Sequence, residues 1–186
     1  TGTERIDTQG TMNTTGNTFD LAIEGQGFFQ LERPDGTIAY TRAGNFKTNA
    51  DGLLVSPDGL PLTPQIQLPE GVSSVTIGND GTVSATVDGQ SEPVEIGAIE
   101  TARFVNPAGL QAIGGNLLLE TAASGAPQVG AAGLEGRGTI RQGALEQSNV
   151  NTVEELVTMI ETQRAYEIAS KMIKATDEML QYVNQQ

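Results

Sequence analysis

Residues 151–184 read NTVEELVTMIETQRAYEIASKMIKATDEMLQYVN, a stretch without Gly or Pro in a chain that contains 23 Gly and 8 Pro. Apolar side chains recur in this stretch every seven residues, at Met159, Tyr166, Ile173 and Leu180. Two further series share that spacing, namely Ala165, Met172 and Met179, and Thr162, Ala169, Thr176 and Val183. The pattern predicts one long amphipathic helix whose broad apolar face suits packing against another helix.

The other face of this expected helix is polar. It carries Arg164, Glu167, Lys171, Lys174, Glu178 and Gln181. Asn151 or Thr152 is suited to cap the helix, with Glu154 or Glu155 as the reciprocal partner. At about 1.5 Å per residue the helix is roughly 50 Å long. Since no other stretch predicts a helical partner, we expect the partner to lie in another chain or in residues missing from this one.

The residues before the helix predict an antiparallel β-domain, a sandwich or an open barrel, at residues 18–141. Short apolar runs with turn residues between them give strands at 19–24, 28–31, 37–41, around 46, 53–55, 72–77, 82–87, 94–99, 103–105, 117–120 and 139–141. A bend or single helical turn is expected at 106–110, and residues 60–64 are too rich in Pro for a central strand. The fold class is therefore mainly β with one long α-helix. Residues 1–17 are expected to be an extended arm with one short strand at Glu4–Thr8, and residues 142–186 a C-terminal helical segment.

The composition excludes several classes of function. The chain has 186 residues, a formal net charge of −13, and no Cys, His or Trp. Without Cys or His, Ser-His and Cys-His nucleophiles and the usual zinc sites are excluded. The acidic balance disfavours nucleic acid, and no run is long and apolar enough to span a membrane. No signal peptide is visible, but this carries little weight in a chain that begins at Thr1 instead of Met. We therefore expect no catalytic, cofactor-binding or metal-binding residue and no membrane insertion.

Asp-Gly pairs are the most frequent local pattern. They occur at Asp35, Asp51, Asp58, Asp80 and Asp88. Calcium loops place several oxygen ligands two residues apart, a spacing that none of these pairs shows. Because Asp and Gly both tolerate positive φ, the pairs favour turns between strands.

Two other patterns are weaker candidates for a site. Gly25-Gln26-Gly27 follows an expected strand as a dinucleotide-binding loop does, but the third Gly is missing and another strand follows. A glycosidase needs only two carboxylates. The candidates near strand ends are Glu24, Glu32, Asp35 and Asp51. Sugar sites use aromatic platforms, and the chain has no Trp and 3 Tyr, so solvated surface charge is the better interpretation.

Several stretches resemble one family. Gly25–Gln30 (GQGFFQ) and Tyr40–Phe46 (YTRAGNF) resemble the start of the β-domain in bacterial flagellar axial proteins, which include the rod and hook proteins. Gln142–Asn151 (QGALEQSNVN), followed by Glu154–Val157 (EELV) and Thr162–Glu167 (TQRAYE), is similar to their shared C-terminal signature. The resemblance extends through nearly the whole chain, and the two motifs together are specific.

Two shorter stretches point to one branch of this family. Phe104–Leu110 (FVNPAGL) and Gly114–Leu117 (GGNL) are similar to the members that build the distal rod. The resemblance implies a structural subunit of the flagellar basal body, which stacks helically with itself into a hollow driveshaft across the periplasm and transmits motor torque to the hook. It also implies export by the flagellar type III secretion apparatus, and contacts with neighbouring rod proteins, the hook protein and the surrounding rings.

The family begins with an N-terminal helix that pairs with the C-terminal helix, and that helix is absent before Thr1, so we expect a truncated chain. The expected subunit-interface residues lie in the C-terminal stretch and are Met159, Arg164, Tyr166, Glu167, Ile173 and Leu180. The arm at Thr3–Asn17 would pack along neighbouring subunits. The interpretation assigns no catalytic, cofactor or metal residue.

Three alternatives stay open from the sequence alone. The chain could be a proximal rod or hook protein of the same family. It could instead be a periplasmic module that binds or hydrolyses cell-wall carbohydrate, which predicts an effect on peptidoglycan that depends on a carboxylate such as Glu24. The long helix could also pack on its own β-domain rather than on a partner.

Overall fold

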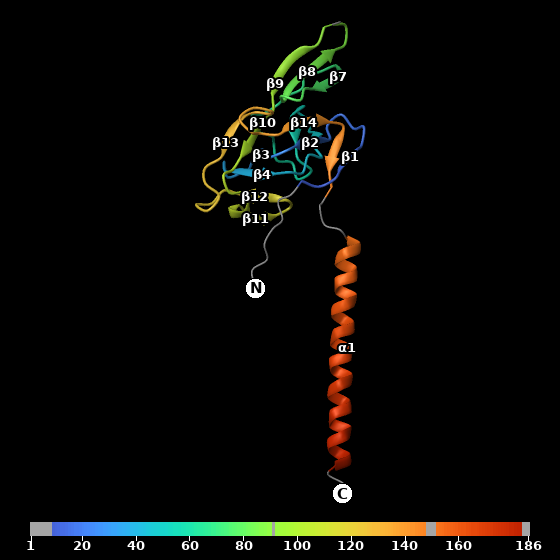
Figure 1. Cartoon of the computed structure of the whole chain (residues 1–186). Helices are drawn as coiled ribbons and strands as arrows, with labels where there is room; N and C mark the ends of the chain where they lie inside the picture. The colour runs from blue at the N-terminus through green and yellow to red at the C-terminus, as the bar shows by residue number, and fades with distance from the viewer. Residues whose placement is uncertain (1–8, 91, 148–151, 184–186) are drawn as a thin grey trace. The chain divides into compact units, whose positions relative to one another are not determined.

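The structure, a computed structural model, describes residues 9–90, 92–147 and 152–183 (Figure 1). The chain divides into two compact units, Thr1–Ser148 and Asn149–Gln186, and each is described by itself. The first, called the β-unit below, is built of antiparallel strands, and the second contains one helix, α1 (Thr152–Val183). The mainly β fold with one long C-terminal helix is therefore confirmed.

The β-unit contains short strands joined by turns. In chain order they are β1 (Met12–Thr14), β2 (Leu21–Glu24), β3 (Phe28–Glu32), β4 (Ile38–Thr41), β5 (Lys47–Thr48), β6 (Leu54–Val55), β7 (Val72–Ile77), β8 (Thr82–Val87), β9 (Val94–Ala98), β10 (Glu100–Arg103), β11 (Gln111–Gly114), β12 (Leu117–Leu119), β13 (Gln128–Ala131), β14 (Thr139–Gln142) and β15 (Ala144–Glu146). One short 3₁₀ helix, η1 (Pro107–Gly109), follows β10. The largest sheet is six-stranded, in the order β11-β12-β4-β3-β10-β13. Smaller sheets are β7-β8-β9, β14-β2, β5-β6 and β1-β15.

The Asp-Gly pairs lie in turns, as the sequence predicts. The Gly of each pair has φ between +76° and +92°, in the left-handed region that only Gly adopts without strain. Asp35 and Asp80 close their turns by accepting hydrogen bonds from the backbone N–H and the hydroxyl of Thr37 and Thr82, respectively. The turn interpretation is confirmed at these positions.

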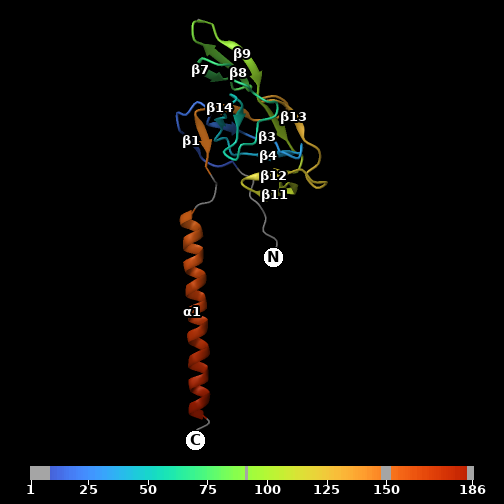
Figure 2. The same cartoon turned by 180° about the vertical axis from the view of Figure 1, so that it is seen from behind.

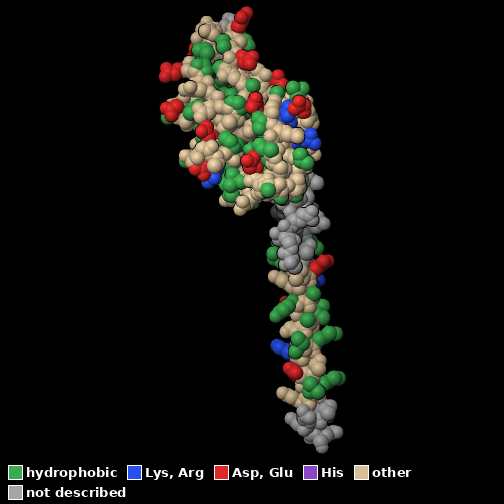
Figure 3. Space-filling model, turned by 90° about the vertical axis from the view of Figure 1, so that its left-hand side faces the viewer, with side chains coloured by type: hydrophobic (Ala, Val, Ile, Leu, Met, Phe, Trp, Pro, Cys, Tyr) green, Lys and Arg blue, Asp and Glu red, His purple; other side chains and the backbone are tan. Residues whose placement is uncertain are grey.

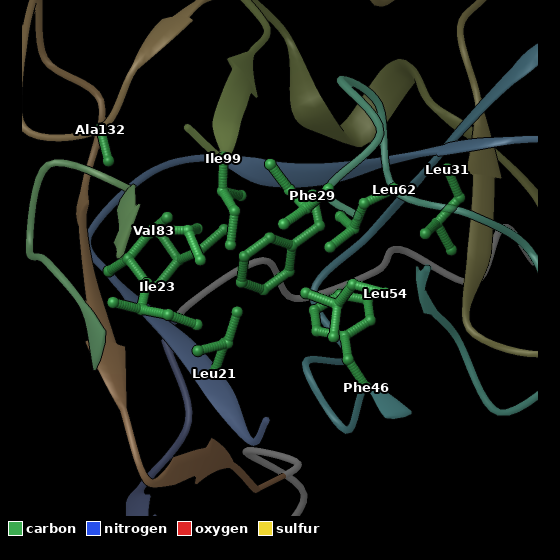
Figure 4. Close-up of a cluster of buried hydrophobic side chains, with 13 residues drawn as sticks. Leu21, Ile23, Phe29, Leu31, Phe46, Leu54, Leu62, Val83, Ile99 and Ala132 are labelled. Atoms are coloured by element: carbon green, nitrogen blue, oxygen red, sulfur yellow. The ribbon is translucent and has the colours of Figure 1, made fainter. Parts of the chain in front are cut away.

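The main core packs on one face of the six-stranded sheet. Phe29 of β3 is fully buried at its centre, and its ring meets Phe46 edge-on at a centroid distance of 5.1 Å (Figure 4). Around this pair lie Leu21, Ile23, Leu31, Leu54, Leu62, Val83 and Ile99. The alternation of Leu21 and Ile23 in β2 therefore predicts their burial correctly, because successive side chains of a strand point to opposite faces.

A second, smaller core lies on the opposite face of the same sheet. Phe28 precedes Phe29 in β3 and packs with Tyr40, Ala102, Phe104 and Leu110. The ring of Phe104 meets Tyr40 at 4.8 Å and Phe28 at 5.9 Å, edge-on in both pairs. Adjacent residues of one strand thus supply both cores, and the sheet is covered on both sides.

The structure corrects one expected strand. The sequence predicts a strand at 103–105, but β10 ends at Arg103, and Val105 is 78% exposed. The partner strand explains the end of β10, because Arg103 pairs with Gln128 and the next partner, Pro127, has no N–H to donate. The chain instead bends into η1, so the expected helical turn at 106–110 is confirmed.

The two ends of the β-unit pair with each other. Met12 lies opposite Glu146 and Thr14 opposite Ala144 in the antiparallel pair of β1 and β15. β1 lies in the stretch expected to be an extended arm, and β15 in the stretch assigned to the helical segment; the three-part division of the chain stays a prediction. The expected strand at Glu4–Thr8 and the expected cap at Asn151 lie outside the described residues.

Candidate assembly surfaces

All six expected interface residues lie on α1, and all are exposed. The exposed fractions of the four apolar ones are 58% for Met159, 78% for Tyr166, 64% for Ile173 and 57% for Leu180. Arg164 and Glu167 are exposed beside them. Their role as interface residues stays a prediction.

The apolar residues of α1 form more than one row along the helix. At about 100° per residue, Met172 and Met179 lie roughly 100° around the helix from Ile173 and Leu180. Met172 is 69% exposed and Met179 75%, and Ile168, at 60%, widens the apolar arc further. Figure 3 shows apolar side chains along the length of the helix. An arc of about half the circumference is wide enough to contact more than one neighbouring helix.

Arg42 ties β15, the last strand of the β-unit, to the turn between β2 and β3. Its Nε and Nη2 lie 2.9 Å and 2.7 Å from Oε2 of Glu146 in β15. Its Nη1 donates to the carbonyl oxygens of Gly25 (2.7 Å) and Gly27 (2.9 Å), and Nη2 donates to that of Ile23 (3.2 Å). One planar guanidinium therefore joins β15 to the turn between β2 and β3, which a point charge such as Lys would not do.

The residues just before β1 join the same network. The backbone N–H of Gly10 donates to Oε1 of Glu146 at 2.8 Å. The side-chain amide of Gln9 donates to the carbonyl of Ile23 and accepts from the N–H of Gly25. Neither Arg42 nor Glu146 was among the expected interface residues, although each lies inside a family motif, YTRAGNF or QGALEQSNVN.

The Gly25-Gln26-Gly27 motif shapes this network. Gly25 and Gly27 have φ of 110° and 146°, and a Cβ on Gly25 would lie 3.1 Å from Cα of Gly138. Only Gly combines this backbone with so close a neighbour. The motif turns its carbonyl oxygens toward Arg42, whereas a dinucleotide loop presents N–H groups to phosphate.

Three of the four carboxylates considered for a glycosidase, those of Glu24, Glu32 and Asp35, have local partners. Arg141 lies 3.0 Å from Glu24, and Gln65 donates to Glu32 at 3.3 Å. The hydrogen bonds from Thr37, with a smaller contribution from Arg33, hold the pKa of Asp35 below its usual value. A general acid needs a raised pKa, so Asp35 is unsuited to that role.

The described residues contain neither a cluster of metal-ligating side chains nor a membrane-spanning helix. No group of three or more Asp and Glu side chains among them is arranged to hold a metal ion. Within the same residues, no helix is both long enough and apolar enough to cross a membrane.

Comparison with known families matches two parts of the chain. Residues 22–85 match the flagellar hook protein FlgE/F/G D1 domain, a stretch that runs from within β2 to within β8 and includes Arg42. Residues 141–186 match the flagellar basal body rod FlgEFG protein C-terminal family, which includes Glu146 and α1. Both ends of the Arg42–Glu146 pair thus lie in matched segments.

Whole-chain relatives agree with these matches. The chain is 49% identical over 183 residues to the flagellar basal-body rod protein FlgG of Buchnera aphidicola, which covers 98% of this chain and 70% of the relative. It is 51% identical over 184 residues to FlgG of Borreliella burgdorferi, covering 98% and 69%. In Caulobacter vibrioides, identity is 46% to FlgG (97% and 69% covered) and 38% to the rod protein FlgF (96% and 69%).

A β-unit whose first and last strands pair, followed by a helix with exposed apolar residues, is typical of a structural assembly protein. The chain belongs to the flagellar basal-body rod protein family. Its place is the basal-body rod, as the resemblance in the sequence implies.

Proposed function

We propose that the chain is a subunit of the distal rod, and that copies of it stack helically into a hollow driveshaft that carries motor torque to the hook. The observation that carries this proposal is the identity of 49% and 51% to two FlgG rod proteins over 98% of the chain. The difference between 46% and 38% identity to FlgG and FlgF of one bacterium supports the distal assignment. The expected partners are further copies, neighbouring rod proteins, the hook protein and the surrounding rings.

The helix supports assembly by helix packing. A helix of 32 residues is about 48 Å long. Its exposed apolar arc would be buried by neighbouring helices, at about 25 cal/mol per Å² of apolar surface removed from water. We propose that Met159, Tyr166, Ile173 and Leu180 fill that contact and that Arg164 and Glu167 make polar contacts beside it. Such a subunit needs complementary surfaces and no catalytic residue.

The test uses the full-length protein in a bacterium whose own FlgG gene has been removed. Ile173→Asp places a charge in the proposed contact, so we expect loss of swimming and of the variant from purified basal bodies. Gln181→Glu, on the polar face of the same helix, is the matched control and should swim normally. Normal incorporation of Ile173→Asp would overturn the proposed contact. Failure of the unsubstituted protein to restore swimming, with success in a strain that lacks FlgF, would overturn the distal assignment.

A further inference from the structure

An open groove lies in the β-unit between the sheet β7-β8-β9 and the turn that joins β5 to β6. Its volume is about 1100 Å³. The sheet lies at one end of the β-unit in both views of the fold (Figures 1 and 2). Near its base, Ile77 and Val83 are buried in the main core, at 5% and 1% exposure. Farther along the same strands, Val75 and Ile96 still pack against the main core but are only partly buried, and they line the groove.

The groove has an apolar wall on the side of the sheet, and on the opposite side two acids lie among polar side chains such as Asn49 and Gln67. Val75, Val87 and Ile96 line it from the sheet. Asp51 and Glu70 line it from the opposite side, and both are exposed. The 55 residues between Lys47 and Arg103 contain four Asp and four Glu but no Lys, Arg or His. A complementary occupant therefore combines an apolar side chain with positive charge.

A turn elsewhere on the β-unit has these properties. Between β13 and β14 the chain reverses at Leu134-Glu135-Gly136-Arg137, where the N–H of Arg137 donates to the carbonyl of Leu134 at 2.9 Å. Glu135 and Gly136 have φ of 50° and 78°, the arrangement of a type I′ turn. Leu134 stands at the first corner and is 60% exposed. The turn thus presents a leucine side chain to solvent.

The turn is held rigidly by two arginines. Arg137, which is 7% exposed, pairs with the Glu135 carboxylate at 3.0 Å and donates to the carbonyl of Ala131 at 3.0 Å. Arg103 donates to the carbonyl of Glu135 at 3.3 Å. A glutamate with positive φ is strained, so these contacts hold the turn in a conformation that it would otherwise rarely adopt. A preorganised turn loses little entropy when it binds.

The surroundings of the turn carry an excess of positive charge. Arg103 and Arg137 both contact the turn, and among the described residues Glu135 is the one acid that pairs with either of them. Arg103 instead donates to the side-chain oxygen of Gln26 at 3.0 Å. Glu100, the next acid along β10, lies three residues from Arg103 and so points to the other face of the sheet.

We propose that the acidic groove of one copy of this chain binds the Leu134–Arg137 turn of a neighbouring copy. The apolar side chain of Leu134 would contact the valines of the groove, while the excess positive charge around the turn would face Asp51 and Glu70. Groove and turn are different surfaces, so the contact is head-to-tail. A contact of this kind extends into a filament when its rotation does not close into a ring. This inference rests on the proposed function and names a contact within the rod.

Disulfide cross-linking tests the contact directly, because the chain has no Cys of its own. Leu134→Cys is combined with Glu70→Cys, or separately with Asp51→Cys, in the full-length protein, and purified basal bodies are oxidised. We expect at least one pair to give a ladder of dimers, trimers and longer chains that collapses on reduction, since a disulfide requires Cα atoms within about 7 Å. Each single variant should give none. Val105→Cys with Glu70→Cys is the matched control, because Val105 is equally apolar and 78% exposed but lies outside the turn.

Incorporation into the rod supplies a second measurement. Leu134→Asp should be depleted at least tenfold from purified basal bodies, whereas Leu134→Met should be incorporated normally. If rods incorporate each double-cysteine variant but neither variant gives a ladder, the contact is overturned and the proposed function still stands. Normal incorporation of Leu134→Asp would have the same meaning. Dimers from Leu134→Cys alone would show a two-fold contact instead and also overturn it. Absence of the unsubstituted protein from basal bodies would overturn the proposed function itself, and the contact with it.

Discussion

Replacement of Arg42 by lysine tests how the ends of the β-unit are held together. Arg42→Lys keeps the charge but loses the planar fork that reaches Glu146 and three carbonyl oxygens at once. A lysine ammonium reaches fewer of these acceptors, so we expect at least two to lose their partner. At about 1 kcal/mol for each lost hydrogen bond in this partly buried site, the free energy of unfolding should fall by about 2 kcal/mol. The side chains of Arg42 and Glu146 are 25% and 12% exposed, which places them between a surface and a buried pair.

The assay is urea unfolding of the full chain, followed by circular dichroism. Arg141→Lys is the matched control, because Arg141 pairs with Glu24 at 3.0 Å but both side chains are about half exposed (51% and 45%), and a change within about 0.5 kcal/mol is expected. Glu146→Ala should also speed hydrogen exchange at the Gly10 amide, whose acceptor it removes. If Arg42→Lys destabilises no more than Arg141→Lys, the network does not fix the ends of the β-unit and the reasoning is wrong.

Two further predictions concern single residues of the β-unit. Gly44→Ala would place a Cβ 1.6 Å from the carbonyl oxygen of Leu21, so we expect no folded protein by circular dichroism. Gly36→Ala is the control: its φ is +79° but the space around it is open, so the free energy of unfolding in urea should fall by only about 1 kcal/mol. A folded Gly44→Ala protein would contradict the packing around Leu21. Burial raises the pKa of Tyr40 to about 12, with a smaller contribution from Glu120. The unfolded chain loses the Tyr40 hydroxyl proton at lower pH than the folded chain does. The free energy of unfolding should therefore be unaffected by Tyr40 below pH 10 and fall from about pH 10 to pH 12. Tyr40→Phe should remove the contribution of Tyr40 to this fall, and an unchanged alkaline stability profile would refute the raised pKa.

The sequence predicted the fold best where strands are buried on one face or form tight hairpins. β7 and β8 match the expected bounds at 72–77 and 82–87, because valine and isoleucine recur there on either side of an Asp-Gly turn. Strands at the edges of sheets were missed. All four residues of β11 are exposed, and β13 has the sequence QVGA, so neither shows an apolar alternation. Their strand conformation follows from pairing with neighbours that are distant in the sequence, which no local pattern reports.

The candidate assembly surfaces also differ in how far the sequence predicts them. The face of α1 follows from spacing along one helix, so its residues could be named from the sequence. The Arg42–Glu146 pair joins positions 104 residues apart, and the groove joins the turn around Asp51 to strands that begin some twenty residues later. Leu134 reads as an ordinary apolar residue in a Gly-rich stretch until its exposure and its turn are known. Contacts of this kind depend on the fold, and the spacing of apolar residues along the sequence does not predict them.

The pairing of β1 with β15 has a consequence for how this protein can vary. Met12 and Glu146 lie directly opposite each other, at a Cα separation of about 5 Å as in any antiparallel pair. A hairpin of a few residues would span that gap as well as the 133 residues between them. The first and last strands of the β-unit therefore meet in a two-stranded stem, β1 and β15. The chain between these two strands can be lengthened, shortened or exchanged, in evolution or by design, while the residues outside the stem keep their spacing.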